Sequence, residues 1–198
     1  SPNGPITFFN NAVSYNNSID ITGGSPEATF RLGYTNQDQK GVLPNSSLKK
    51  NNINFNGSYN ILKNLKVSAS ANYINTNGKG RNETGYNNNI MSSFRQWYQV
   101  NVDVKMMKDL WEKTGRNVTW NRTYFDDPVG LYWDSYYWTR YKNYESDERN
   151  RLLGFTQADW KATNWLSFMG RVSVDSYSEL QEERRAVLST ALEFGPGR

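Results

Sequence analysis

The 198-residue sequence contains no cysteine and no histidine. Without cysteine, the chain can form no disulfide, no thiolate metal site and no thiol nucleophile. Without histidine, it lacks the commonest general base and the commonest metal ligand. It also contains no Gly-rich phosphate loop, catalytic triad or paired-carboxylate arrangement. We therefore predict that the chain is not an enzyme and that it needs no cofactor and no metal.

Long hydrophobic runs are missing too. The mean hydropathy is −0.83, and nowhere do about 18 apolar residues follow one another, as a membrane-spanning helix requires. Strands of a transmembrane β-barrel remain compatible with this composition, because their alternating residues average to a polar hydropathy.

The net charge of +4 comes from basic residues that are scattered along the chain, with Lys49–Lys50 and Arg184–Arg185 as the only doublets. A nucleic-acid surface needs a clustered basic footprint, so we predict no nucleic-acid partner.

Apolar and polar residues alternate most clearly in two segments, Ala28–Thr35 and Asn52–Ile61. Side chains alternate across a strand, so each segment has one apolar face and one polar face. The polar positions are mostly Asn, Ser, Thr and Gly, which suits a wet interior better than a surface in bulk solvent. Apolar-out, polar-in alternation over roughly ten residues is typical of transmembrane β-barrels.

The same alternation predicts six strands, at 12–22, 28–37, 51–61, 65–73, 149–160 and 166–175. Residues 1–10 form a lead-in, 11–74 hold the first four strands, 75–148 form a long loop, 149–187 hold the last two strands, and 188–198 continue no pattern. Within the loop, 90–98 and a segment from Asp103 to Gly115 have helical spacing. In the fifth strand, Leu153 and Phe155 indicate one face but Trp160 the other, so its outward side stays open. A bulge would reconcile them.

The predicted connections alternate between short and long. Those at 23–27, 63–64 and 161–164 are short, whereas 38–50 and 75–146 are long. Outer-membrane barrels have short periplasmic turns and long extracellular loops, so the alternation orients the strands. Trp160 and Trp165 flank one short turn, as residues of an aromatic girdle would. Six strands are too few to close a barrel, so we predict an arc of a larger one or an open antiparallel sheet. The abrupt start at Ser1 indicates a piece of a longer protein.

Several short motifs, in their order and spacing, resemble SusC/RagA-like TonB-dependent transporters. They are SIDITGG at 18–24, FRLGYTNQDQKG at 30–41, NSSLKKNN at 45–52, LKVSAS at 65–70, WLS at 165–167 and GRVSVD at 170–175. The resemblance implies a 22-stranded barrel with an N-terminal plug in the outer membrane of a Gram-negative bacterium. It also implies import of glycan or peptide fragments, a SusD-like lipoprotein lid, contact with membrane lipid, and TonB-coupling parts that lie outside this chain.

An aromatic segment, 120–144, is the candidate contact surface of the long loop. Its candidate residues are Trp120, Tyr124, Tyr132, Trp133, Tyr136, Tyr137 and Trp138. Three uses stay open: stacking on a sugar, packing on the lid lipoprotein, or forming a local core. Arg31, Arg171 and Asp175 fall on predicted lumen faces, where they would line the transport path or pair with the plug.

Two further interpretations concern the acidic residues of the long loop and an alternative fold. Asp126, Asp127 and Asp134 offer oxygen ligands, but they lack the spacing of a calcium loop, and we interpret them as solvated loop residues.

The alternative to the transporter is a soluble antiparallel β module that binds carbohydrate through 120–144. That alternative predicts two packed sheets that bury Phe30, Phe55 and Phe168 together, whereas a barrel arc leaves these rings exposed on one face.

Overall fold

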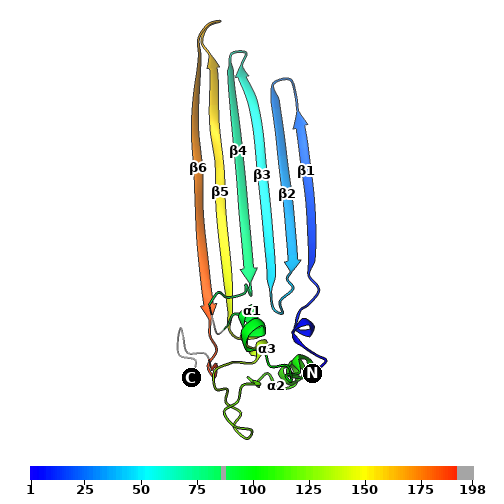
Figure 1. Ribbon diagram of the computed structural model, residues 1–198. Coiled ribbons are helices and arrows are strands. Elements are labelled where there is room, and N and C mark those ends of the chain that lie inside the picture. Colours follow the sequence, from blue (N-terminus) through cyan, green and yellow to red (C-terminus); the bar gives the residue numbers. More distant parts are fainter. Residues whose placement is uncertain (86–87, 191–198) are drawn as a thin grey trace.

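The computed structural model describes residues 1–85 and 88–190. Six strands form one antiparallel sheet, and each strand pairs with the next one along the chain (Figure 1). The strands are β1 (Val13–Gly24), β2 (Ala28–Lys40), β3 (Ser47–Leu62), β4 (Leu65–Lys79), β5 (Tyr144–Lys161) and β6 (Ser167–Arg184). The predicted all-β, up-and-down architecture is confirmed. Of the predicted tail at 188–198, only 188–190 lie within the described residues.

The strands are longer than the alternation predicts. β2 continues to Lys40 and β3 begins at Ser47, so the connection predicted at 38–50 shrinks to 41–46. β5 begins at Tyr144 rather than 149, and β6 continues to Arg184. The added residues are mostly charged or amide side chains, which hide the period-two signal. Backbone hydrogen bonds do not depend on apolar side chains, so pairing continues beyond the alternating stretch.

The register across β5 settles its orientation. β5 pairs with β4 and with β6 without any register shift, so no bulge reconciles the two apolar patterns of this strand. Trp160 lies opposite Leu65 and Phe168, and these three side chains share a face. Leu153 and Phe155 therefore lie on the opposite face, beside the polar side chains of β4. Their apolar character misled the sequence pattern because polar faces tolerate occasional apolar residues.

Helices and loops gather at the end of the sheet where β1 begins (Figure 1). We call this part the end domain; it comprises the described residues of 1–12, 80–143 and 185–190. Its helices are η1 (Pro5–Phe8), α1 (Ile90–Ser92), the π-helical turn η2 (Ser93–Trp97), α2 (Val104–Thr114) and α3 (Tyr136–Tyr141). Its buried core consists of Phe8, Ile90, Val102, Val104, Met107, Tyr136 and Tyr137. Among the described residues, none of the helices has the length and apolar character needed to cross a membrane.

The predicted helix after Asp103 is confirmed as α2, which is followed by Gly115. The Asp103 carboxylate accepts a hydrogen bond from the Met106 amide at 2.9 Å, and so caps the helix. It also accepts one from the Asn3 side chain at 2.8 Å, which attaches the lead-in to the helix. These bonds, that from Met106 first, favour the charged carboxylate and hold the pKa of Asp103 below its ordinary value.

Gly154 provides a test of how closely β4 and β5 pack. A Cβ at this position would collide with the Ser70 carbonyl oxygen of β4, whereas a Cβ at Gly170 on β6 would meet nothing within 4 Å. We expect Gly154→Ala to lower the free energy of unfolding by about 1–3 kcal/mol, because overpacking forces backbone shifts. Denaturant titration in detergent would measure this, with Gly170→Ala as the matched control. Equal stability of the two variants would contradict the register described above.

Candidate functional site

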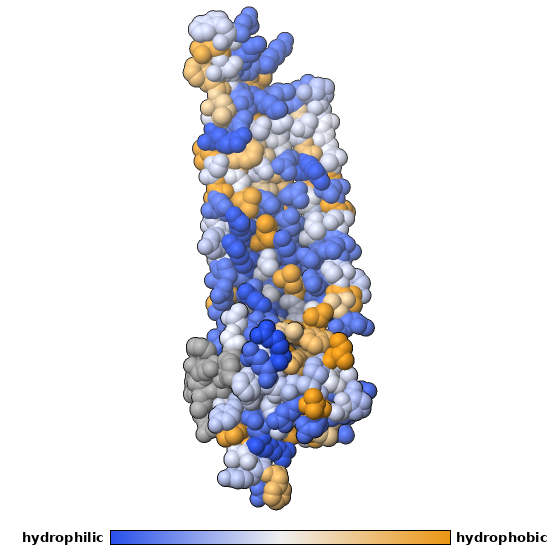
Figure 2. All heavy atoms as spheres, in the orientation of Figure 1, coloured by the Kyte–Doolittle hydropathy of each residue, from blue (hydrophilic) through white to orange (hydrophobic). Residues whose placement is uncertain are grey.

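One face of the sheet collects most of the apolar side chains of the six strands. Residues directly opposite on neighbouring strands share a face, so the register arranges them in rows. One row consists of Ile19, Tyr34, Ile53, Tyr73 and Leu152, and the next consists of Ile21, Leu32, Phe55, Ala71, Gly154 and Val174. We call this the apolar face. The other side, which we call the polar face, is the one turned toward the viewer in Figure 2, where hydrophilic residues dominate the sheet.

No second layer covers the apolar face within the described residues. Phe30, Phe55 and Phe168 are 46%, 39% and 52% exposed and all lie on this one face. The two packed sheets expected for a soluble carbohydrate-binding module are not found, because all six strands belong to a single sheet. An exposed apolar surface that continues across six strands marks a site of contact with another apolar phase or partner.

A row of mainly amide side chains crosses the apolar face near the end domain. This row crosses the sheet as Asn17, Asn36, Asn51, Asn75, Asn150 and Ser178. The Tyr34 hydroxyl donates to Asn51 Oδ1, and the Tyr73 hydroxyl donates to Asn150 Oδ1, both at 2.8 Å. The two tyrosines thus keep their rings on the apolar side and their hydroxyls on the polar side of a sharp boundary.

The three residues predicted to face a lumen all lie on the polar face. Arg31 forms an ion pair with Asp20 of β1 at 3.0 Å. Asp175 accepts a hydrogen bond from Arg151 of β5 at 2.8 Å. The Arg171 guanidinium donates to the Gln157 side chain at 2.8 Å and lies over the Phe155 ring. These three charged side chains therefore bind partners on adjacent strands of the same sheet.

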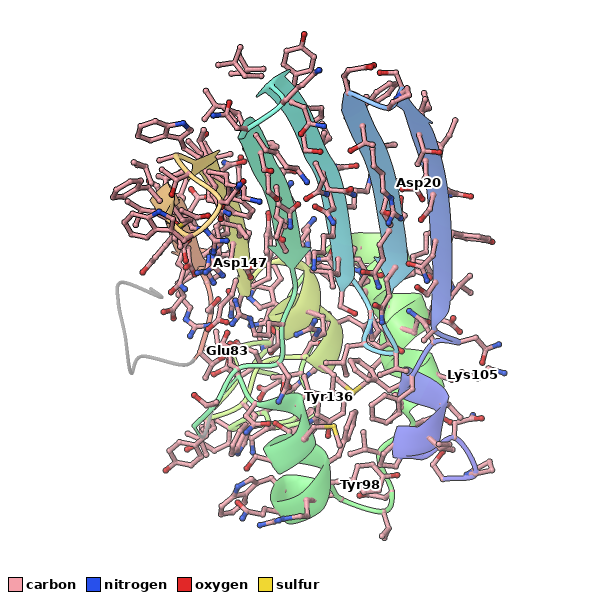
Figure 3. The ribbon with its side chains drawn as sticks, turned by 90° about the horizontal axis from the view of Figure 1, so that it is seen from above. Asp20, Glu83, Tyr98, Lys105, Tyr136 and Asp147 are labelled. Carbon is pink, nitrogen blue, oxygen red and sulfur yellow. The ribbon has the colours of Figure 1, made fainter. Side chains whose placement is uncertain are left out.

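An open hollow of about 490 Å³ lies where the polar face meets the end domain. Its charged lining residues include Arg81, Asp147, Arg149 and Glu179. Arg81 and Asp147 form a close ion pair at 2.5 Å, whereas Arg149 and Glu179 are 3.9 Å apart. Figure 3 labels Asp147 on β5 and Glu83 between the strand ends and the helices.

The seven candidate aromatic residues separate into two groups. Trp133, Tyr136, Tyr137 and Trp138 are buried, and Trp120 is half-buried. Burial raises the pKa of Tyr136 and raises that of Tyr137 to about 12, because it disfavours the phenolate. Tyr124 and Tyr132 remain 68% and 65% exposed. Tyr124 lies in a loop whose ends are joined by the bridge between Arg122 and Gly130, and Tyr132 follows that loop. Only the second group is accessible to a substrate or partner in this structure.

Arg140 of α3 joins the long loop to the strand ends. Its buried guanidinium donates to the Pro44 carbonyl at 3.1 Å, to the Arg81 carbonyl at 3.3 Å and to the Gly80 carbonyl. Burial lowers the pKa of Arg140 from its ordinary value, partly offset by the charge of Glu83. Gly80 has a φ of +67°, and a Cβ there would collide with the Asn45 carbonyl oxygen. This close approach of two connections requires glycine.

A polar cluster attaches the residues after β6 to the end domain. The buried Asp134 carboxylate accepts hydrogen bonds from the Thr190 amide and from the Asn117 side chain, both at 2.6 Å. The Asn143 side-chain oxygen accepts from the Ala186 amide at 3.0 Å and the Ser189 hydroxyl at 2.9 Å. Asp134 is therefore a structural acceptor, and the described residues contain no group of three or more metal-ligating side chains.

Sequence patterns do not reveal these anchoring residues. Arg140 and Asn143 lie in the aromatic segment without any spacing that indicates a role. Arg185 pairs with Glu83 through two contacts of 2.7 Å, and both side chains are nearly buried. The partners in these bonds are separated by 96 residues for Arg140 and Pro44, and by 102 for Arg185 and Glu83. The Arg184–Arg185 doublet is the only sequence feature that marks one of these anchoring residues.

No family model matches the chain, and no curated protein sequence matches it. Any assignment of function therefore depends on the residues and on the geometry of the two faces, the hollow and the end domain.

Arg140→Ala tests whether the end domain is held to the sheet through this guanidinium. Its removal leaves three backbone carbonyls without their donor, and we expect a loss of at least about 3 kcal/mol in the free energy of unfolding. Limited proteolysis should then cut within 80–143 before it cuts the strands. The exposed Arg95→Ala is the control and should leave the cleavage pattern unchanged. Equal protease resistance in both variants would show that Arg140 does not anchor this segment.

Proposed function

We propose that this chain forms part of the wall of a transmembrane β-barrel in a SusC/RagA-like TonB-dependent transporter of a Gram-negative outer membrane. In this proposal the barrel imports glycan or peptide fragments beneath a SusD-like lipoprotein lid. TonB acts through parts of the protein that lie outside this chain. The observation that carries the proposal is the apolar face, which extends over six strands and is covered by nothing in the described residues.

The dimensions of the apolar face support contact with lipid. On β4 it runs from Leu65 to Tyr73, eight residues apart, which corresponds to about 26 Å at roughly 3.3 Å per residue. A strand tilt of about 40° reduces the height to about 20 Å, close to the apolar band of about 25 Å in outer-membrane barrels. Trp160 and Phe168 stack at one border, and Tyr34 and Tyr73 stand at the other. Aromatic residues favour both membrane interfaces.

The connections support an orientation with the end domain outside the cell. The turns 25–27, 63–64 and 162–166 lie at one end of the sheet, and the connections 41–46 and 80–143 lie at the other. Because 41–46 is nearly as short as 162–166, the asymmetry now depends on one long insertion. An insertion of that size belongs on the extracellular side of an outer-membrane barrel.

The polar face suits a wet interior in the same proposal. Its ion pairs and hydrogen bonds join neighbouring strands, as between Asp20 and Arg31 or Arg151 and Asp175. Of the seven candidate aromatic residues in the end domain, the exposed Tyr124 and Tyr132 are the ones available to substrate or lid. The burial of Trp133 and of Tyr136–Trp138 favours a local core for the rest of the aromatic segment.

Expression in detergent-free buffer tests the proposal directly. A wall segment with this apolar face should aggregate without detergent and should fold in detergent micelles or phospholipid vesicles, where the face is covered. Circular dichroism and size-exclusion chromatography distinguish these outcomes. A soluble monomer that unfolds cooperatively in buffer would overturn the barrel assignment.

Substitution of Phe55 tests which face meets lipid. Phe55 lies on the apolar face near mid-strand, and its neighbour Asn54 lies on the polar face. We expect Phe55→Arg to disfavour folding into vesicles by roughly 2–4 kcal/mol, because a charge would enter the hydrocarbon region. Asn54→Arg is the matched control and should cost much less. The equilibrium between folded and unfolded chain in urea with vesicles gives both values, and an equal cost would show that the faces are assigned wrongly.

A further inference from the structure

The hollow at the junction of the polar face and the end domain contains hydrogen-bonding capacity that the chain does not use. Arg149 of β5 and Glu179 of β6 lie directly opposite each other in the register, and both line the hollow. Their closest approach is 3.9 Å, too long for a hydrogen bond. Arg149 Nε is buried and has no hydrogen-bond partner among the described residues.

The neighbouring charges of the hollow are satisfied. Asp147 accepts a hydrogen bond from Arg81 at 2.5 Å. Glu179 Oε1 accepts a hydrogen bond from the Gln181 side chain at 2.5 Å, which leaves its other oxygen toward Arg149. The Arg149 guanidinium stacks on the Tyr177 ring, with its central carbon 4.4 Å from the ring centroid. Stacking holds the guanidinium in place, so that its free N–H groups are oriented before any ligand arrives.

The Arg149 guanidinium and the second Glu179 oxygen form a loose ion pair without a hydrogen bond between them. Such a pair is complementary to a ligand that carries both charges close together. A carboxylate would accept bonds from Arg149, and an ammonium would donate to Glu179; such charge-assisted bonds are the stronger kind. Neutral sugars are less suited to this place, because they need an open aromatic face. On the polar face, the rings of Tyr177 and Phe155 are covered by Arg149 and Arg171.

We propose that the hollow lined by Arg149 and Glu179 binds a small zwitterion, either an α-amino acid or a dipeptide. Its volume of about 490 Å³ lies within the usual range of ligand pockets, roughly 300–1,000 Å³, and accommodates either molecule. The inference rests on the proposed function only in treating the polar face as part of a transport path. It narrows the cargo of that path to the charged products of peptide breakdown.

Isothermal titration calorimetry on the chain folded in detergent micelles tests the site. The probes are L-alanine, dialanine and N-acetylalanine amide, which has the same side chain but neither charge. We expect one or both zwitterions to bind at least about tenfold more tightly than the neutral amide, with an affinity that falls as salt is added. The comparison of alanine with dialanine identifies which of the two the hollow admits. Equal binding of the neutral amide, or no binding of either zwitterion, would overturn the proposal.

Variants assign the binding to this pair. Arg149→Gln and Glu179→Gln should each weaken zwitterion binding about tenfold or more, while Arg149→Lys should restore part of it. The control is Glu182→Gln, on the same strand but on the side of the sheet opposite Arg149 and Glu179, which should bind normally. Unchanged binding in both Gln variants would place the site elsewhere. Insertion of the same samples into vesicles is measured separately. A chain that inserts but does not bind the zwitterion refutes this inference alone. A chain that binds the zwitterion in micelles but does not insert refutes only the barrel assignment.

Discussion

The hydrogen-bonded register of β1 to β6 is the constraint on which the rest of the structure depends. Side chains alternate with a period of two, so a slip of one residue in any strand would move its apolar residues to the opposite face. The register has one irregularity, between Asn60 and Leu62 near a turn. Everything from the rows of isoleucine and phenylalanine to the amide boundary follows from this alignment. The two faces therefore present different chemistry to their surroundings across the whole sheet.

The end domain solves a different problem, since a 64-residue insertion between β4 and β5 must find its own core. It does so by burying aromatic rings from α3 against the lead-in and η2, as with Tyr136, whose ring centroid lies 4.6 Å from that of Phe94. Polar anchors then attach this core to the sheet. Arg140 reaches two separate connections, and Arg185 reaches Glu83. These buried charges are retained with their partners, because an unpaired one would cost far more.

On the polar face of the sheet, charged side chains pair with partners on neighbouring strands. Most of its arginines have a carboxylate or amide partner on the next strand, which keeps the face hydrated without leaving single charges. Arg149 is the exception, since its guanidinium stacks on Tyr177 and does not bond to Glu179.

Period-two alternation by itself determined the strands, their antiparallel order and the division of apolar from polar residues, since these depend on neighbours within a few positions. The helix cap at Asp103 was also predictable from the sequence, because it depends on Met106, three residues away. Tertiary structure alone decided where the strands end, which way Leu153 and Phe155 face, and that Tyr136–Trp138 are buried while Tyr124 and Tyr132 are exposed. It also decided the role of Arg140, whose acceptor at Pro44 is 96 residues away. Such contacts form between residues distant in the sequence, and no local pattern encodes the partner.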